Sequence, residues 1–188
     1  MEKKRENIWN VPNVLTMLRA ALIPVFLVLY YSSLRYQALG VFLLASFTDL
    51  LDGFIARKYN LVTNFGKLMD PLADKLMVIS VLLVQTFGGI LPPAAVIIVL
   101  LKEIIMVLGG IYMLKKGIVV YSEPVGKAAQ FLFIAAISLS FFHADFIAMK
   151  YVQWDMLLLW ISVGLTLLAL AFYTRRAIEK LREARSQA

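Results

Sequence analysis

The stretch that decides the fold is D-L-L-D-G-F-I-A-R at residues 49–57, followed after eight residues by G-K-L-M-D-P-L-A-D at residues 66–74. Its four Asp residues stand in sequence that otherwise has the apolar character of membrane-spanning helices. A charged side chain near the centre of a bilayer costs at least ~2.5 kcal/mol, so such residues face a bundle interior or a water-filled cavity. Four carboxylates within this short stretch therefore predict a functional site inside a membrane bundle.

The spacing places these residues on two helical stripes. Residues 49, 52, 53, 56 and 57 follow the i, i+3, i+4, i+7, i+8 pattern of one helix face, and residues 66, 70 and 74 follow i, i+4, i+8. If the chain turns back between them, two acidic stripes face each other and need a compensating cation. Because the chain has no Cys and a single distant His, the ligands are oxygens, which suit Mg²⁺ or Mn²⁺. Two such ions would balance four carboxylates.

The other residues on the stripes are small or cationic. Gly53, Ala56 and Gly66 remove side-chain bulk beside the acids and leave room for a ligand. Arg57 offers a planar donor fork suited to phosphate. Free space, a cationic fork and paired metals, which recur in displacement at phosphorus, together predict a phosphate-bearing substrate.

The pattern D-x-x-D-G-x-x-A-R, eight residues, G-x-x-x-D-x-x-x-D resembles the signature of the CDP-alcohol phosphotransferase family (CDP-alcohol phosphatidyltransferase class I) at every fixed position. The resemblance implies an all-α integral membrane enzyme of six transmembrane helices, usually a homodimer, that joins a CDP-linked lipid to an alcohol and releases CMP. It implies a general base at Asp74 and ligands for two divalent cations, Mg²⁺ or Mn²⁺, at Asp49, Asp52, Asp70 and Asp74. The implied CDP site consists of Asp49, Gly53, Ala56, Arg57 and Gly66.

A second run, P-N-V-L-T-M-L-R at residues 12–19, resembles the phosphatidylglycerophosphate synthase and cardiolipin synthase branch of this family. Asn13, Thr16 and Arg19 recur at helical spacing, so we expect Arg19 to point toward the active cavity or the headgroup layer. The resemblance favours an enzyme of phospholipid biosynthesis that transfers the phosphatidyl group of CDP-diacylglycerol to sn-glycerol 3-phosphate, giving phosphatidylglycerophosphate and CMP. The implied ligands of the acceptor phosphate are Arg19, Lys75, Lys102 and Lys127.

Two departures from that branch keep a second acceptor open. Ala129-Gln130 stands where the synthases have a Lys and a Thr, and Gly110 replaces a further Arg. Because a thinner set of cations recognises phosphate less well, cardiolipin synthase, which uses phosphatidylglycerol as the alcohol, is the alternative. A proton- or cation-coupled transporter is the alternative of a different class, although neither inverted repeats nor broken helices are evident.

The bulk composition fits one membrane domain over residues 1–188. The chain is 61% apolar with a mean hydropathy of +0.80, which excludes an ordinary soluble domain. Each apolar segment approaches the ~20 residues that cross a ~30 Å hydrocarbon core. A short interfacial segment is expected at the amino terminus, before six helices at about 13–32, 37–58, 67–89, 92–114, 125–144 and 153–174.

The cations lie at helix ends, so the net charge of +7 indicates anionic lipid headgroups rather than nucleic acid as the partner. Fourteen Lys and Arg residues fall on one predicted side of the bilayer, whereas Arg35 and Lys150 fall on the other. The positive-inside rule therefore places both termini and the acidic site on the cytoplasmic side of the cell (plasma) membrane. Residues 180–185 are expected to form an exposed helical tail.

Overall fold

The computed structural model describes residues 10–59, 63–118 and 124–186, and the regular elements in these ranges are helices, as the sequence predicted. They are α1 (Val11–Tyr31), α2 (Arg35–Lys58), α3 (Asn64–Phe87), α4 (Pro93–Lys115), α5 (Pro124–Ser140), α6 (His143–Ala148) and α7 (Trp154–Ser186). The predicted interfacial segment falls on residues 1–9, which lie outside the described ranges.

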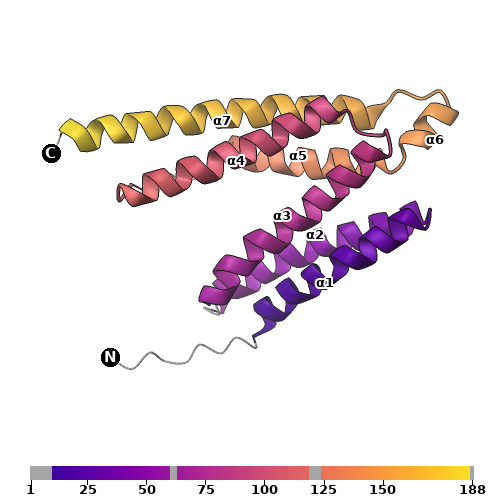
Figure 1. The fold of residues 1–188 in the computed structure, drawn as a ribbon, viewed down its shortest axis with the longest axis horizontal. Helices are drawn as coiled ribbons and strands as arrows, with labels where there is room; N and C mark the ends of the chain where they lie inside the picture. Colours follow the sequence, from indigo (N-terminus) through magenta and orange to yellow (C-terminus); the bar gives the residue numbers. More distant parts are fainter. Residues whose placement is uncertain (1–9, 60–62, 119–123, 187–188) are drawn as a thin grey trace. The chain divides into compact units, whose positions relative to one another are not determined.

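The chain divides into two compact units, residues 1–87 and residues 88–188. In the first unit, α1 packs against both α2 and α3, which contact each other less (Figure 1). In the second unit, α7 packs against α5 and α4. The acidic signature belongs entirely to the first unit, so α1–α3 are the helices that position the candidate site. The prediction of a single domain over residues 1–188 stays a prediction.

Turn-forming residues set the helix ends in the first two thirds of the chain. The Asn10 side chain caps α1, because its Oδ1 accepts the Asn13 N–H at 2.9 Å. Gly89 (φ 73°) and Gly117 (φ 72°), which follow α3 and α4, adopt the left-handed backbone that favours glycine. The first four helices accordingly begin and end within three residues of their predicted positions.

The predicted boundaries are wrong in the last third of the chain. α5 ends at Ser140, where the Phe142 N–H donates to the Leu139 carbonyl at 2.9 Å. The short helix α6, which follows, was not predicted. α7 continues to Ser186, so the expected tail is the end of one long helix. Its last turns are rich in Ala, Glu, Lys and Arg, which favour helix, and Arg175 pairs with Glu179 at 2.9 Å.

Four helical segments are long and apolar enough to cross a membrane. They are Val11–Tyr31, Arg35–Ala56, Pro93–Lys115 and Trp154–Glu183. α5 is shorter, with 17 residues, and the first half of α3 carries the charged residues of the signature. Large apolar side chains such as Val28 and Leu108 are exposed on these segments, as expected for helices that face lipid rather than water. These features support a multi-pass membrane protein.

Candidate active site

The four signature carboxylates stand on two helices of the first unit. Asp49 and Asp52 lie on α2, and Asp70 and Asp74 lie on α3. The Asp52 side chain is 2% exposed, that of Asp49 is 36% exposed, and Asp70 and Asp74 are partly buried. The sequence predicted two acidic helices and left open whether Arg19 of the first helix points toward them. In the structure α1 packs against both acidic helices and supplies polar side chains to their carboxylates.

Arg19 on α1 joins the acidic residues of α2 to the backbone of α3. Its side chain is 1% exposed; Nη1 lies 2.7 Å from Asp49 Oδ1, and Nη2 donates to Asp52 Oδ2. Nη1 also donates to the backbone carbonyl of Asp70 at 3.5 Å, a long hydrogen bond. A guanidinium buried among apolar helices needs opposite charge, and the two carboxylates provide it. Arg19 therefore points into the acidic site, which is one of the two orientations that its spacing predicted.

Thr16 and Asn13, on the same face of α1, bind α3 and the residue before it. The Thr16 hydroxyl lies within hydrogen-bond distance of two acceptors, Asp70 Oδ1 and, at 3.1 Å, the Pro12 carbonyl of its own helix. The Asn13 Oδ1 accepts the Thr63 hydroxyl at 3.0 Å, and Thr63 Oγ1 in turn accepts the Gly66 N–H at 3.0 Å. Because Thr63 directly precedes α3, this last bond satisfies one of the free N–H groups at the helix start. The polar face of α1 thus orients both the beginning of α3 and its first signature carboxylate.

Gly66 allows α1 and α3 to approach closely. A Cβ atom at this position would lie 2.8 Å from Asn13 Oδ1, 3.3 Å from Thr63 Oγ1 and 3.5 Å from Asp70 Oδ2. The sequence predicted that the missing side chain makes room for a ligand. In this structure the space lets Asn13 and Thr63 meet, and the contact of Gly66 with CDP stays a prediction.

Four further residues of the predicted CDP and acceptor sites lie in the same unit. Gly53 and Ala56 on α2 are partly buried, as is Lys75 on α3, directly after the last signature Asp. Arg57 belongs to the last turn of α2, but its side chain lies outside the described part of the structure. These residues therefore share the three-helix unit with the carboxylates.

Two of the predicted acceptor ligands belong to the second unit. Lys102 on α4 is 17% exposed, and its Nζ lies 2.6 Å from Oε1 of the neighbouring Glu103. Lys127 on α5 is exposed. The contact of either lysine with an acceptor phosphate stays a prediction.

The acidic residues fit divalent cations in their chemistry, although a guanidinium holds two of them here. All four supply the oxygen ligands that Mg²⁺ and Mn²⁺ prefer. Within the described ranges, no group of three or more Asp, Glu, His or Cys side chains converges closely enough to hold an ion. Arg19 bridges Asp49 and Asp52 instead, and one guanidinium offsets only one of four negative charges. The chemistry of the donor set therefore fits divalent cations.

The second unit holds a polar pair that the sequence did not lead us to expect. Nδ1 of His143, the first residue of α6, lies 2.6 Å from Oδ2 of Asp155 in the first turn of α7, and Asp155 is fully buried. The available signal was the occurrence of one His and one Asp at the two ends of a short connection between apolar segments. The pair lies outside the signature and joins α6 to α7.

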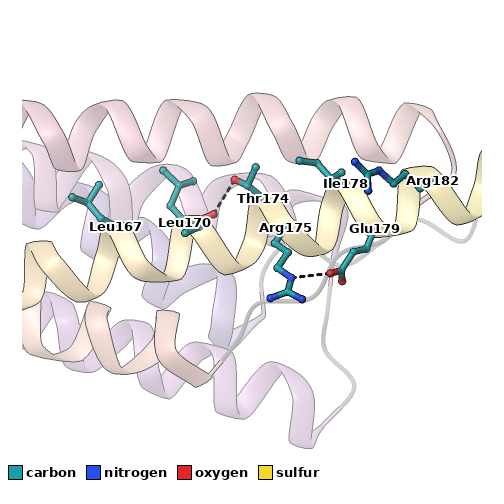
Figure 2. Close-up of a pocket in the computed structure, with 8 residues that line it drawn as sticks. Leu167, Leu170, Thr174, Arg175, Ile178, Glu179 and Arg182 are labelled. Carbon is teal, nitrogen blue, oxygen red and sulfur yellow. Dashed lines mark hydrogen bonds and ion pairs between the residues drawn. The ribbon is translucent and has the colours of Figure 1, made fainter.

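A shallow groove of ≈ 630 Å³ runs along one face of α7 (Figure 2). Figure 2 shows the Arg175–Glu179 ion pair on this face. The groove contains none of the residues predicted for catalysis, metal binding or substrate binding, so we do not assign the active site to it. Its lining consists of Leu167, Leu170, Ala171, Thr174, Arg175, Ile178, Glu179 and Arg182.

Comparison with known proteins covers most of the chain. Residues 9–168 match the family described as CDP-alcohol phosphatidyltransferase. This range includes the polar residues of α1, the whole acidic signature, and Lys102 and Lys127 of the second unit.

Several curated relatives carry related names. The "CDP-diacylglycerol--glycerol-3-phosphate 3-phosphatidyltransferase" of Bacillus subtilis is 32% identical over 176 residues, covering 86% of this chain and 91% of that protein. The protein of the same name from Pseudomonas fluorescens is 48% identical over 96 residues, 47% of this chain and 49% of that protein. A "Probable phosphatidylglycerophosphate synthase" of Mycobacterium tuberculosis is 35% identical over 141 residues, 72% of this chain and 67% of that protein.

Proposed function

This chain belongs to the CDP-alcohol phosphatidyltransferase family, and we propose that it transfers the phosphatidyl group of CDP-diacylglycerol to sn-glycerol 3-phosphate, forming phosphatidylglycerophosphate and CMP. The observation that carries the proposal is the meeting of the polar face of α1 with the signature carboxylates in one three-helix unit. The names of the Bacillus subtilis and Pseudomonas fluorescens relatives support glycerol 3-phosphate as the acceptor.

The chemistry assigns a separate role to each part of the signature. Asp49, Asp52, Asp70 and Asp74 would hold two divalent cations, Mg²⁺ or Mn²⁺. When bound, these cations polarise the pyrophosphate of CDP-diacylglycerol and neutralise charge on the departing CMP. Asp74 accepts the proton of the acceptor hydroxyl as that oxygen attacks the β-phosphorus in line. The bond to CMP breaks as the new phosphate ester forms, so the reaction needs no covalent enzyme intermediate.

The CDP moiety would lie along the signature face of α2 and the start of α3. Gly53 and Ala56 leave the α2 backbone accessible beside the carboxylates, and Arg57 would place its guanidinium fork on a phosphate. Asp49 and Gly66 complete this proposed site. Direct binding of CDP-diacylglycerol to the purified protein is the measurement that tests these contacts.

By resemblance, Lys75, Lys102 and Lys127 remain the proposed ligands of the acceptor phosphate. Arg19, which the resemblance also implied, binds two carboxylates in this structure. One observation keeps phosphatidylglycerol as a second candidate acceptor. At the departures from the synthase pattern, Gly110 faces the Tyr173 hydroxyl, 3.6 Å from where its Cβ would be, and Ala129 is 2% exposed. Neither position contributes a cation that could bind phosphate.

We further propose that α1–α5 and α7 all cross the bilayer, which gives six spans, and that the two units form one domain. Short α5 and charged α3 would cross within the bundle, where other helices cover their polar groups. The distribution of Lys and Arg favours a plasma-membrane protein with both termini and the acidic site on the cytoplasmic side. A homodimer is part of the same proposal, by resemblance to the family.

The first experiment is CMP release from CDP-diacylglycerol by the detergent-purified protein with Mg²⁺ or Mn²⁺, with glycerol 3-phosphate and phosphatidylglycerol supplied in parallel. We expect CMP with glycerol 3-phosphate alone; CMP with phosphatidylglycerol alone would overturn the acceptor assignment. Asp49→Ala and Asp70→Ala should abolish release, and Asp74→Asn should abolish it while CDP-diacylglycerol still binds. Asp145→Asn, an acid of α6 outside the signature, is the control. Wild-type turnover in any signature variant would contradict the proposed site.

A further inference from the structure

The Arg19 guanidinium lies between the carboxylates of Asp49 and Asp52. Two of its nitrogens bind carboxylate oxygens of Asp49 and Asp52, one of them at 2.7 Å, and both acids come from the same face of α2. Its side chain is 1% exposed and that of Asp52 is 2% exposed, so water reaches this cluster only at Asp49, which is 36% exposed. The structure thus holds two of the four proposed metal ligands in an ion pair with a side chain of α1.

The remaining donors of Arg19 are not well satisfied. Nε is buried without a hydrogen-bond partner, and the contact of Nη1 with the Asp70 carbonyl is long, at 3.5 Å. A buried N–H without an acceptor is unfavourable. The arrangement therefore depends mainly on the attraction between the guanidinium and the two carboxylates, and a competing cation acts on that attraction directly.

A divalent cation and Arg19 would draw on the same two carboxylates, of which Arg19 contacts Oδ1 of Asp49 and Oδ2 of Asp52. An ion bound by Asp49 and Asp52 would bring a charge of +2 close to the guanidinium. Coulomb repulsion then makes the binding of the ion and the binding of the guanidinium less favourable. The ion and Arg19 therefore bind these carboxylates less favourably together than either does alone. Conversely, when no ion is bound, Arg19 keeps the carboxylates paired and ties α1 to α2.

We propose that Arg19 is an internal counter-ion that competes with divalent cations for Asp49 and Asp52 and thereby lowers the metal affinity of the site. It is a positioning residue, since it acts on the carboxylates and not on the substrate. The proposal rests on the metal site of the proposed function. It also assigns Arg19 a role different from the acceptor-phosphate contact that the sequence implied.

The test is Mn²⁺ binding to the full-length protein in detergent, measured by calorimetry or by the loss of the free-Mn²⁺ paramagnetic resonance signal, with no lipid substrate present. Arg19→Gln removes the charge, and we expect Mn²⁺ to bind on the order of tenfold more tightly. Arg19→Lys keeps a charge but cannot bridge two carboxylates with a planar fork, so it should bind Mn²⁺ more tightly by a smaller factor. Arg35→Gln, at the start of α2 and beside the Tyr36 ring, is the matched control with unchanged affinity.

Thermal unfolding provides a second readout that a purely structural role would not reproduce. In EDTA, Arg19→Gln should unfold at a lower temperature than wild type, because two carboxylates lose their counter-ion. Saturating Mn²⁺ should then raise the midpoint of Arg19→Gln more than that of wild type, because the ion replaces the missing charge. A structural role alone predicts the same midpoint loss with and without Mn²⁺.

The outcomes separate this inference from the proposed function. If wild type binds Mn²⁺ and both Arg19 variants bind it equally or more weakly, the counter-ion role is wrong while the metal-dependent enzyme stands. If Arg19→Gln cannot be purified, the affinity of Arg19→Lys decides in the same way. If wild type binds no Mn²⁺ and yet releases CMP in EDTA, both the counter-ion role and the metal part of the proposed function are wrong.

Discussion

Buried polar side chains of α1 bind groups on other helices, whereas the buried serines of α5 and α7 bind within their own helix. On α2, the buried Thr48 hydroxyl likewise donates within its helix, to the Ala45 carbonyl at 2.7 Å. In the first unit, Arg19, Thr16 and Asn13 all reach from α1 to residues of α2, α3 or the segment that starts α3. In the second unit, the buried hydroxyls of Ser140 and Ser162 donate to backbone carbonyls three residues earlier, at 2.6 and 2.7 Å. Both units therefore bury polar atoms, but the polar face of α1 satisfies them across helices and the serines of α5 and α7 within one helix.

The difference separates polar residues that build a site from those that accompany packing. A hydroxyl bonded to its own helix is satisfied wherever that helix lies and does not orient a neighbour. A side chain bonded to another helix sets the rotation and depth of both. Such interhelical bonds in membrane proteins contribute only ~0.6 kcal/mol on average. Several of them gathered on one face of α1 are therefore better explained by the carboxylates they orient than by stability.

Replacing Gly66 should disturb this comparison most. The Cβ of Gly66→Ala would lie 2.8 Å from Asn13 Oδ1, so either α3 must move or the Asn13–Thr63 bond must break. Overpacking of this kind costs about 1–3 kcal/mol. Because the same movement shifts Asp70, we expect CMP release to fall on the order of 100-fold together with a lower unfolding temperature.

The matched control is Gly40→Ala in α2, where an added Cβ would meet no atom within 4 Å. It should retain full CMP release, with an unchanged or slightly higher unfolding temperature, since Ala favours helix more than Gly. The double variant Asn13→Ala/Gly66→Ala removes the clashing oxygen and should be more stable than Gly66→Ala alone. Full activity in Gly66→Ala would mean that the close approach of α1 and α3 does not orient the site.

The sequence predicted the helices and the acidic faces but not the role of α1. Apolar segments near the length of a membrane span, bounded by Gly88-Gly89 and Gly117, set α1–α4 to within three residues. The spacing of Asn13, Thr16 and Arg19 predicted that they share a face. Helical periodicity gives no information on which helix that face meets, so the contacts of Arg19 with Asp49 and Asp52 required the structure.

The misses in the second unit have local physical causes. A single turn ends α5, and the His–Asp contact that joins α6 to α7 lies between residues twelve apart. Neither feature has a periodic signal. The length of α7 follows from its polar but strongly helix-forming end, which a search for apolar spans excludes. Hydropathy alone therefore predicts helix ends least well near the boundary of a membrane span.

The His143–Asp155 pair is the exception within the second unit, and breaking it tests whether it is structural. Asp155 is fully buried and its Oδ1 has no hydrogen-bond partner, so His143→Ala would leave the whole carboxyl group without one. We expect a loss of about 1–3 kcal/mol in unfolding free energy, seen as a lower unfolding temperature. CMP release per folded molecule, measured well below that temperature, should not change.

A double variant distinguishes the loss of a hydrogen-bond partner from the loss of side-chain packing. His143→Ala/Asp155→Leu removes both polar groups, and replacing both partners by apolar groups is often nearly neutral. It should therefore be more stable than His143→Ala alone. A double variant that is less stable than the single one, or a loss of CMP release in His143→Ala at low temperature, would show that the pair does more than join α6 to α7.

The smallest effect is expected from Thr16→Val, which keeps the shape of a buried side chain. It removes the contact with Asp70 on α3 and the contact, at 3.1 Å, with the Pro12 carbonyl of its own helix. Its matched partner is Thr86→Val on α3, where the lost bond runs to the helix's own Leu82 carbonyl at 2.7 Å. Each should lower the unfolding free energy by no more than ~1.7 kcal/mol. Only Thr16→Val should also lower CMP release, by up to about tenfold, because Asp70 loses a donor that orients it for metal binding.

Parallel measurements of unfolding temperature and CMP release in the two variants test this difference. Equal activity in the two variants would mean that a hydrogen bond across helices orients the site no better than a bond within one, and the contrast between the two units would then concern packing alone.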